Sequence, residues 1–256
     1  MDNAIGLYME GIRDGNAKEA ITKYAGARYT QHSAGVKDGI EGFLEFFDGF
    51  LARTPVRDIR IMRGIEEGTY VFVHAYQYLN NGTAQWVTTD IFDTDENDKL
   101  IEHWDVISAY EQETASGHTM IDGGTEITDM EKTTENKEIV RNFLVDVLQE
   151  GNYQNLSRYI SSEKYIQHNP KIKDGIESIA EYLQSMKDKG ITFKYDNIFK
   201  LIGQGNFVVS YCQVTYGHKK LAVFDIFRLE NGLIVEHWDN MEEILPKELW
   251  GNSGKF

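Results

Sequence analysis

Glu102-His103-Trp104-Asp105 returns later in the chain as Glu236-His237-Trp238-Asp239. Two further matched pairs precede these stretches in the same order: Tyr29-Thr30-Gln31-His32 with Tyr165-Ile166-Gln167-His168, and Asp90-Ile91-Phe92 with Asp225-Ile226-Phe227. Matched segments in a fixed order at so long a period are typical of two complete copies of one domain. The sequence therefore predicts a tandem repeat, and the repeated residues include His and Asp, which carry chemistry.

Length and composition agree with two ordinary domains. The chain has 256 residues, of which 41% are hydrophobic and three are proline, as in an ordered globular protein. Residues 116–135 are rich in Gly, Thr and charged side chains and are predicted to be a linker. We therefore expect a first domain over residues 1–115 and a second over residues 136–256.

Net charge, hydropathy and cysteine content limit the partners and the cellular compartment that we expect for this protein. The net charge is −15, with most of the acidic excess in the first half, so a nucleic-acid partner is not expected. No apolar run approaches the ~20 residues needed to span a bilayer, and the N-terminus lacks the pattern of a secretory signal. The single cysteine, Cys212, cannot form an internal disulfide and is predicted to be a buried apolar residue. We expect a cytoplasmic protein with no membrane partner.

Each half begins with helical patterns and continues with strand patterns. Helices are predicted near residues 5–12, 40–51, 139–148 and 176–186, and strands at residues 70–76, 85–92, 100–109, 207–213, 220–229 and 233–240. The first helix of each half runs out at a glycine, Gly15 or Gly151, which suits a left-handed cap. Helices followed by antiparallel strands predict an α+β domain in which N-terminal helices cover one face of a curved sheet.

Counting back from the hairpin turns predicts which side chains share a face. With Glu230-Asn231-Gly232 as a three-residue loop, Asp225 lies opposite His237; with residues 95–98 as a four-residue loop, Asp90 lies opposite His103. Because side chains alternate along a strand, Asp239 joins the first pair and Asp105 joins the second. The sequence predicts an Asp, His, Asp cluster in each domain.

Such a cluster suits proton transfer. A carboxylate raises the pKa of a neighbouring imidazole, and two adjacent carboxylates raise the pKa of one of them, as general acid/base chemistry requires. On the cavity side of the sheet the cluster is a site, and on the outer side it is a polar surface. We expect the candidate catalytic residues to be Asp90, His103, Asp105, Asp225, His237 and Asp239, joined from the helical layer by His32 and His168.

Other residues are assigned by position in the repeat. Candidate substrate contacts are His74, Tyr211, Gln31 and Gln167. No metal site is expected, because paired His residues at ligand spacing are missing. Trp104 and Trp238 fall on the strand face opposite to the cluster and need a cover. The simplest cover is the sheet of the other domain, which predicts an intramolecular pseudo-dimer of the two domains.

Together these motifs resemble the SnoaL-like polyketide cyclase family, within the nuclear transport factor two-like superfamily of cone-shaped, cystatin-like domains. In the second half the resemblance is carried by Tyr165-Ile166-Gln167-His168-Asn169-Pro170, Asp174-Gly175, Asp225-Ile226-Phe227-Arg228 and the run Asn231 to Asp239. The first half departs from it, with Ser33-Ala34 in place of Asn-Pro and Asp93 in place of Arg228. The fuller motif favours the second half as the working site.

The resemblance implies an Asp that acts as acid and base in an intramolecular aldol closure, at Asp105 and Asp239, assisted from Asp90 and Asp225. Such a reaction needs no cofactor. The fold also hosts isomerases, dehydratases, hydrolases and binding modules. We therefore expect an acid/base enzyme of aldol cyclase, isomerase or lyase type that acts on a small apolar carbonyl compound. The alternative is a non-catalytic ligand-binding or protein-interaction module in which one or both pockets are degenerate.

Overall fold

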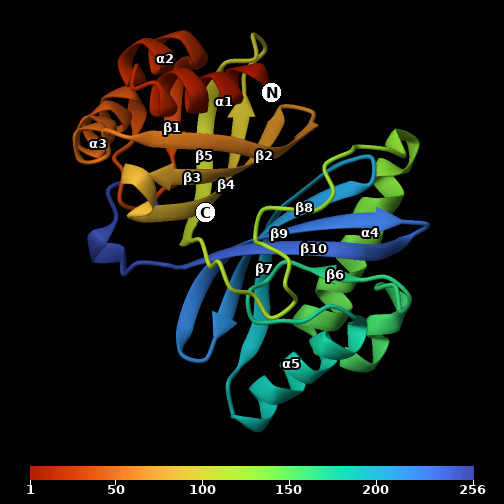
Figure 1. Ribbon diagram of the computed structural model, residues 1–256. Coiled ribbons are helices and arrows are strands. Elements are labelled where there is room, and N and C mark those ends of the chain that lie inside the picture. Colours follow the sequence, from red (N-terminus) through yellow and green to blue (C-terminus); the bar gives the residue numbers. More distant parts are fainter. The chain divides into compact units, whose positions relative to one another are not determined.

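The computed structural model describes residues 1–256 and divides into two compact units. Unit 1 comprises Met1–Tyr110 and the C-terminal segment Ile244–Phe256, and unit 2 comprises Glu111–Glu243. Both units are α+β, as the sequence predicts, and each contains one five-stranded sheet (Figure 1). The return of the C-terminal segment to unit 1 leaves no trace in the sequence pattern.

In unit 1, three helical segments precede or interrupt the strands. They are α1 (Asp2–Gly6), which continues as the π-helical turn Leu7–Arg13, α2 (Ala17–Tyr24) and α3 (Gly39–Arg53). The strands are β1 (Ala25–Gln31), β2 (Arg57–Glu67), β3 (Tyr70–Leu79), β4 (Ala84–Thr94) and β5 (Leu100–Ala109). Their order is β1-β5-β4-β3-β2, antiparallel except for the parallel pair β1 and β5. The strands β1 and β2 and the helix α2 are additions to the predicted elements.

Unit 2 repeats this plan. Its helices are α4 (Thr133–Phe143), which continues as the π-helical turn Leu144–Gln149, and α5 (Ile176–Asp188). Its strands are β6 (Ile166–Gln167), β7 (Phe193–Gln204), β8 (Phe207–Tyr216), β9 (Lys219–Glu230) and β10 (Leu233–Glu243). The order β6-β10-β9-β8-β7 matches that of unit 1 strand for strand. The sequence repeat is therefore a repeat of the fold.

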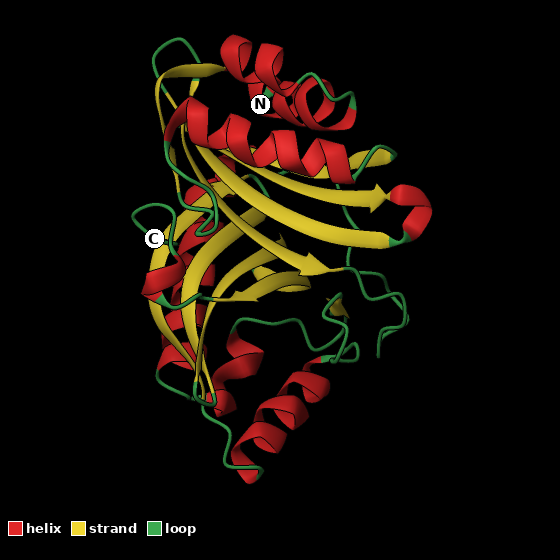
Figure 2. Cartoon of the chain, turned by 90° about the vertical axis from the view of Figure 1, so that its left-hand side faces the viewer, coloured by secondary structure: helices red, strands yellow, loops and turns green.

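The helices of each unit cover one face of its curved sheet (Figure 2). In unit 1, Leu7 and Phe43 of the helices pack in one core with Val73 and Phe92 of the sheet. In unit 2, the equivalent core joins helical and strand residues in the same way. Gly15 and Gly151 both have positive φ, 85° and 78°, as expected where the first helix of each half ends. The face of the sheet under the helices is therefore the inner wall of each unit.

The predicted register of the last hairpin is wrong in both units. Each Asp of the first strand faces a residue two positions further along the second strand than predicted. Asn231 and Gly232, with φ of 51° and 77°, form a two-residue turn instead of the three-residue loop, and Glu230 pairs with Leu233. A bulge between Ile234 and Glu236 then adds one residue to β10. Asp225 consequently faces Asp239, not His237.

The same error occurs in unit 1, where a bulge follows the turn between β4 and β5 and Asp90 faces Asp105, not His103. A displacement of two residues preserves the alternation of side chains. For this reason the predicted Asp, His, Asp face survives the wrong register in both units.

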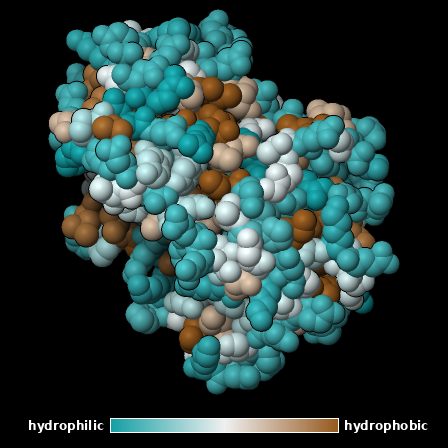
Figure 3. Space-filling model, in the orientation of Figure 1, coloured by the Kyte–Doolittle hydropathy of each residue, from teal (hydrophilic) through white to brown (hydrophobic).

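The surface in the view of Figure 3 is mostly hydrophilic, with separate hydrophobic patches. No helix is both long enough and apolar enough to cross a bilayer.

Candidate functional site

The two strands of the last hairpin in unit 1 bring three side chains together under the helices. Asp90 comes from β4, and His103 and Asp105 come from β5, and each is at most 8% exposed. Nε2 of His103 lies 2.8 Å from Oδ1 of Asp90. We call Asp90, His103 and Asp105 the first site.

Gln31 fixes the proton on the other side of the imidazole. Its Oε1 accepts the backbone N–H of Ser33 at 2.8 Å, so this atom is an acceptor. Nδ1 of His103 lies 2.9 Å from the same oxygen and must therefore donate to it. Nε2 then faces a carboxylate, and a hydrogen bond there requires one proton between His103 and Asp90. His103 and Asp90 therefore form a hydrogen-bonded pair inside the sheet.

Tyr8 is the second partner of Asp90. Its hydroxyl donates to Oδ2 of Asp90 at 2.5 Å and lies 2.9 Å from Oγ1 of Thr88. Burial, followed by the charge of Asp90, raises the pKa of Tyr8 well above its ordinary value. Burial also raises the pKa of Asp90, against the opposing effect of His103. Tyr8 is therefore a phenol that donates its proton to Asp90.

Asp105 has a different environment. Nζ of Lys255 donates to Oδ1 of Asp105 at 2.8 Å, and both side chains are at most 5% exposed. Burial raises the pKa of Asp105, but the ammonium of Lys255 and then the charge of His103 outweigh burial, so the pKa is lowered. The first site thus combines the Asp105 carboxylate with the hydrogen-bonded pair of His103 and Asp90.

Unit 2 builds the equivalent second site from Asp225 of β9 and His237 and Asp239 of β10. Nε2 of His237 lies 3.0 Å from Oδ1 of Asp225, and Nδ1 lies 3.0 Å from Oε1 of Gln167. Burial lowers the pKa of His237, but the hydrogen bond and charge of Asp225 prevail and raise it. Nδ2 of Asn169 donates to Asp239 at 2.6 Å. Burial raises the pKa of Asp239.

Asp225 accepts two more hydrogen bonds. They come from the hydroxyls of Tyr195 at 2.9 Å and of Ser210 at 3.0 Å. The tyrosine donor therefore comes from strand β7 in unit 2 and from the N-terminal helix in unit 1. Sequence reasoning missed Tyr8 and Tyr195, although a Tyr on a buried helix face or strand needs a partner for its hydroxyl.

A cavity leads to each site, and the two cavities differ in size. The cavity of unit 1 has a volume of about 370 Å³ and reaches Asp90, His103 and Asp105. Its other walls are mainly apolar, among them Leu7, Phe43, Phe46, Phe47, Phe50, Trp86 and Ile107. The cavity of unit 2 reaches the second site but has a volume of only about 70 Å³. Both clusters therefore face inward, which excludes the reading of a polar surface.

His32 and His168 do not join the sites. They lie on the outer face of the sheet, stacked on Trp104 and Trp238 with ring centroids 4.9 Å and 4.5 Å apart. The reason is alternation, because each follows a Gln whose side chain points inward. The prediction that they join from the helical layer is wrong.

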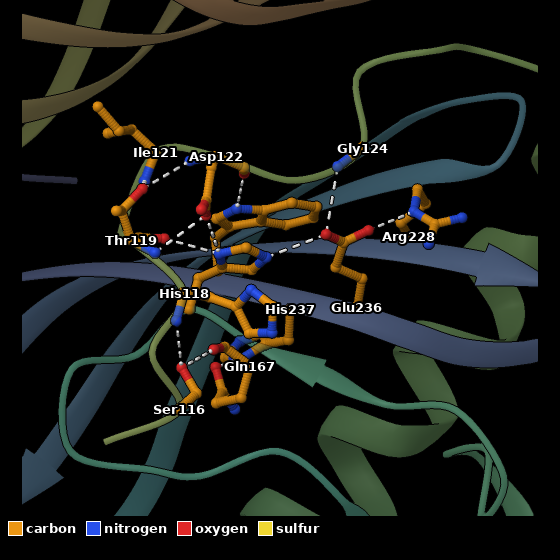
Figure 4. Close-up of polar contacts among 12 residues, drawn as sticks. Ser116, His118, Thr119, Ile121, Asp122, Gly124, Gln167, Arg228, Glu236 and His237 are labelled. Carbon is orange, nitrogen blue, oxygen red and sulfur yellow. Dashed lines mark hydrogen bonds and ion pairs between the residues drawn. The ribbon is translucent and has the colours of Figure 1, made fainter. Parts of the chain in front are cut away.

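The segment that precedes α4 covers the outer face near Glu236, where the backbone N–H of Gly124 donates to that carboxylate (Figure 4). Nε2 of His168 lies 3.0 Å from Oε1 of Glu236, and Nδ1 lies 2.7 Å from the carbonyl oxygen of Thr119. The indole N–H of Trp238 donates to the carbonyl oxygen of Asp122. This cluster belongs to the packing of unit 2.

His74 and Tyr211 also fail to reach the cavities. Both lie on the outer strand face, where Nδ1 of His74 is 2.7 Å from a guanidinium nitrogen of Arg63 and Tyr211 stacks on Phe224. Gln31 and Gln167, in contrast, line the cavities and contact the site histidines. Of the four predicted substrate contacts, the two glutamines are placed where a ligand can meet them.

The geometry of each site also bears on metal binding. In each site the three candidate ligand atoms lie within 4.8 Å of one another. The hydrogen bonds to His, Tyr, Asn and Lys account for this closeness without an ion. In the first site, the ammonium of Lys255 on Asp105 would oppose a second cation.

Comparisons with known proteins agree with the fold. Residues 140–237 match the model of the SnoaL-like domain. The matched residues lie in the second repeat, and unit 1 has the same strand order as unit 2. No curated protein matched the chain.

Similar solved structures are each about the size of one repeat. A provisionally assigned ketosteroid isomerase from Kribbella flavida has 14% identity and a TM-score of 0.38, over 45% of this chain and 83% of its own. An LEH-like epoxide hydrolase from M. tuberculosis has 19% identity and a TM-score of 0.36, over 43% and 85%. An NTF2-like protein of unknown function from Cytophaga hutchinsonii has 20% identity and a TM-score of 0.34, over 47% and 95%.

Proposed function

We propose that the first site is the centre of a cofactor-independent acid/base enzyme, of aldol cyclase, isomerase or lyase type, that acts on an apolar carbonyl compound. One observation carries the proposal. The Asp105 carboxylate and the proton shared by His103 and Asp90 lie together at a cavity of about 370 Å³ with mainly apolar walls. That volume is in the range of small-molecule sites, ~300–1,000 Å³.

The chemistry follows from the two kinds of group. Asp105 removes a proton from the carbon next to the carbonyl, and the electrons of that C–H bond move to the carbonyl oxygen to give an enolate. The proton held between Asp90 and His103 supplies the hydrogen bond for the enolate oxygen, while the Tyr8 hydroxyl keeps its bond to Asp90. Asp105 then returns the proton to another carbon, or the enolate carbon attacks a second carbonyl and closes a ring, and the alkoxide so formed takes the proton from Asp105.

Unit 2 supports a second candidate function, that of a non-catalytic module. Its cavity of about 70 Å³ is well below the volume of small-molecule sites. Asp225 already accepts hydrogen bonds from Tyr195, Ser210 and His237. On this proposal, the fuller sequence motif of the second repeat serves packing. The proposal therefore places catalysis at the first site and not at the second, which the sequence motif favours.

Two further parts of the proposal come from the sequence. The tandem arrangement replaces the pairing of two identical chains, so one chain of 29.4 kDa is the working unit. Gel filtration tests this point.

A single buried cysteine suits the cytoplasm, where disulfides are rare.

Hydrogen–deuterium exchange at carbon tests the enzymatic proposal without knowledge of the substrate. Apolar cyclic ketones of one to three rings, with 2-tetralone as the first probe, are incubated in D2O and followed by NMR. We expect the wild type to speed exchange next to the carbonyl and Asp105→Asn to lose at least about 100-fold of that rate. Asp239→Asn is the matched control and should retain it. Binding of the ketones without faster exchange would assign unit 1 to the binding modules instead.

A further inference from the structure

Lys255 is the one cation that contacts the first site, and it comes from the far end of the chain. It lies in the segment that follows β10, yet its side chain is buried and its Nζ is 2.8 Å from Oδ1 of Asp105. A buried lysine is costly unless it is paired. Asp105 is an anion that its Nζ contacts directly.

The backbone of the C-terminal segment is held in place around this contact. Nδ2 of Asn252 donates to the carbonyl oxygens of Ser33 and Val36, each at 2.7 Å, and the carbonyl oxygen of Gly254 lies 2.8 Å from Nδ1 of His32. Gly254 has a φ of 104°, which favours glycine. The segment is thus fixed on the loop after β1 and delivers Lys255 to one place.

The second site has no buried lysine on its aspartate; the cation that acts on Asp239 is the exposed Lys171, whose charge works against the raised pKa of Asp239. There Asp239 accepts a neutral hydrogen bond from Nδ2 of Asn169 at 2.6 Å. In the first repeat Ser33 occupies the position of Asn169 and its hydroxyl hydrogen-bonds Asp105, and Lys255 adds an ion pair to the same carboxylate. The repeats therefore differ in that Asp105 has a buried ammonium beside its neutral donor, whereas Asp239 has a neutral donor and no buried ammonium.

We propose that Lys255 is a positioning residue of the first site, which holds Asp105 as a carboxylate through a buried ion pair. The C-terminal segment of unit 1 thereby sets the protonation state of the first site. Directions of the pKa agree, since that of Asp105 is lowered and that of Asp239 is raised. The catalytic consequence, an unprotonated base at neutral pH, rests on the function proposed above, whereas the ion pair does not.

The wild-type protein provides the first test. Protein labelled with ¹³C at the Asp side-chain carboxyl is titrated from pH 8 to pH 4 by NMR, and the two resonances are assigned from Asp105→Asn and Asp239→Asn. On acidification we expect Asp239 to take up a proton before Asp105. Coincident midpoints, or earlier protonation of Asp105, would overturn the proposal. This comparison needs no variant that disturbs the ion pair.

Variants then isolate the lysine. Lys255→Met should move the midpoint of Asp105 upward by at least about one pH unit, a tenfold change in its protonated fraction at a given pH. Lys255→Arg keeps the cation and should restore the midpoint, and Lys247→Met, at an exposed lysine of the same segment, should leave it unchanged. If Lys255→Met does not fold, Ser33→Asn combined with Lys255→Met supplies the amide of the second site. Asp105 should then titrate as Asp239 does, and an unmoved midpoint would contradict the proposal.

The outcomes for the proposal and for the enzyme are separable. If Asp105 titrates as expected but ketone exchange is unaffected by Asp105→Asn, the ion pair stands and the proposed enzyme fails. If ketone exchange depends on Asp105 but Lys255→Met leaves the titration midpoint of Asp105 unchanged, the proposed enzyme stands and the proposed role of Lys255 fails.

Discussion

Oε1 of Gln31 lies 2.9 Å from Nδ1 of His103 and holds the imidazole in the tautomer that points Nε2 at Asp90. Gln167 does the same for His237 in the second repeat. A side chain that orients a histidine in this way fixes where its remaining proton can go. The Gln of the repeated Gln-His pair is therefore part of the site, whereas the His beside it is not.

Gln31→Leu should destabilise unit 1 by about 1–3 kcal/mol, because it leaves the N–H of a buried imidazole without an acceptor. Gln31→Glu keeps an acceptor and should lose less. Chemical denaturation measures both, with Gln112→Leu as a control at an exposed glutamine. Equal stability of Gln31→Leu and the control would show that the tautomer is held by other contacts.

His237 makes the stability of unit 2 depend on pH. Its pKa is raised in the folded state, so the native protein binds the proton more tightly than the unfolded chain does. The resulting stability is complete below the unfolded pKa, about 6.5, and is lost as pH rises through the folded pKa. It amounts to about 1.4 kcal/mol for each pH unit between the two pKa values.

Urea unfolding at pH 6 and at pH 8.5 measures this dependence. We expect the wild type to lose stability between these pH values and His237→Gln to lose less. His218→Gln, at an exposed histidine, should follow the wild type. A pH profile for His237→Gln identical to that of the wild type would assign the dependence to another group.

The difference in cavity size predicts where an apolar dye binds. 8-Anilinonaphthalene-1-sulfonate should bind in the cavity of unit 1, because that cavity is the larger of the two at the sites, about 370 Å³, and has aromatic walls. Ala84→Trp fills part of this cavity and should weaken binding by at least about tenfold, as measured by fluorescence titration. Ala52→Trp, at an exposed position of α3, is the matched control. Undiminished binding to Ala84→Trp would place the dye outside the cavity.

Much of the fold could be predicted from the sequence because its signals are local. Strand alternation placed Asp225, His237 and Asp239 on one face even though the bulge in β10 shifted the register. Bulges depend on how a hairpin twists against its neighbours, so the pattern of one strand does not reveal them.

Local sequence patterns could not predict the contacts between residues that are distant in sequence. Lys255 reaches Asp105 only because the C-terminal segment returns to unit 1, and nothing near Lys255 in the sequence marks that path. The sizes of the two cavities are another example, since they depend on how the helices of each unit pack against its sheet.

Glu236 on the outer face of unit 2 should matter for stability and not for chemistry. Burial raises its pKa, but the hydrogen bonds of His168 and Arg228 prevail and lower the pKa to about 2. A carboxylate with a lowered pKa stabilises the fold above its unfolded pKa, about 4.3, and loses that contribution as pH falls toward 2.

Glu236→Gln should therefore cost about 3 kcal/mol at pH 7, less at pH 4 and almost nothing near pH 2. Glu230→Gln is the control, because Glu230 pairs with the same Arg228 at the surface, where ion pairs contribute at most about 1 kcal/mol. Denaturation at several pH values measures both variants, and ketone exchange should be unchanged because Glu236 points away from both cavities. A loss that stays constant from pH 7 to pH 3 would mean that Glu236 acts through its packing and not through its charge.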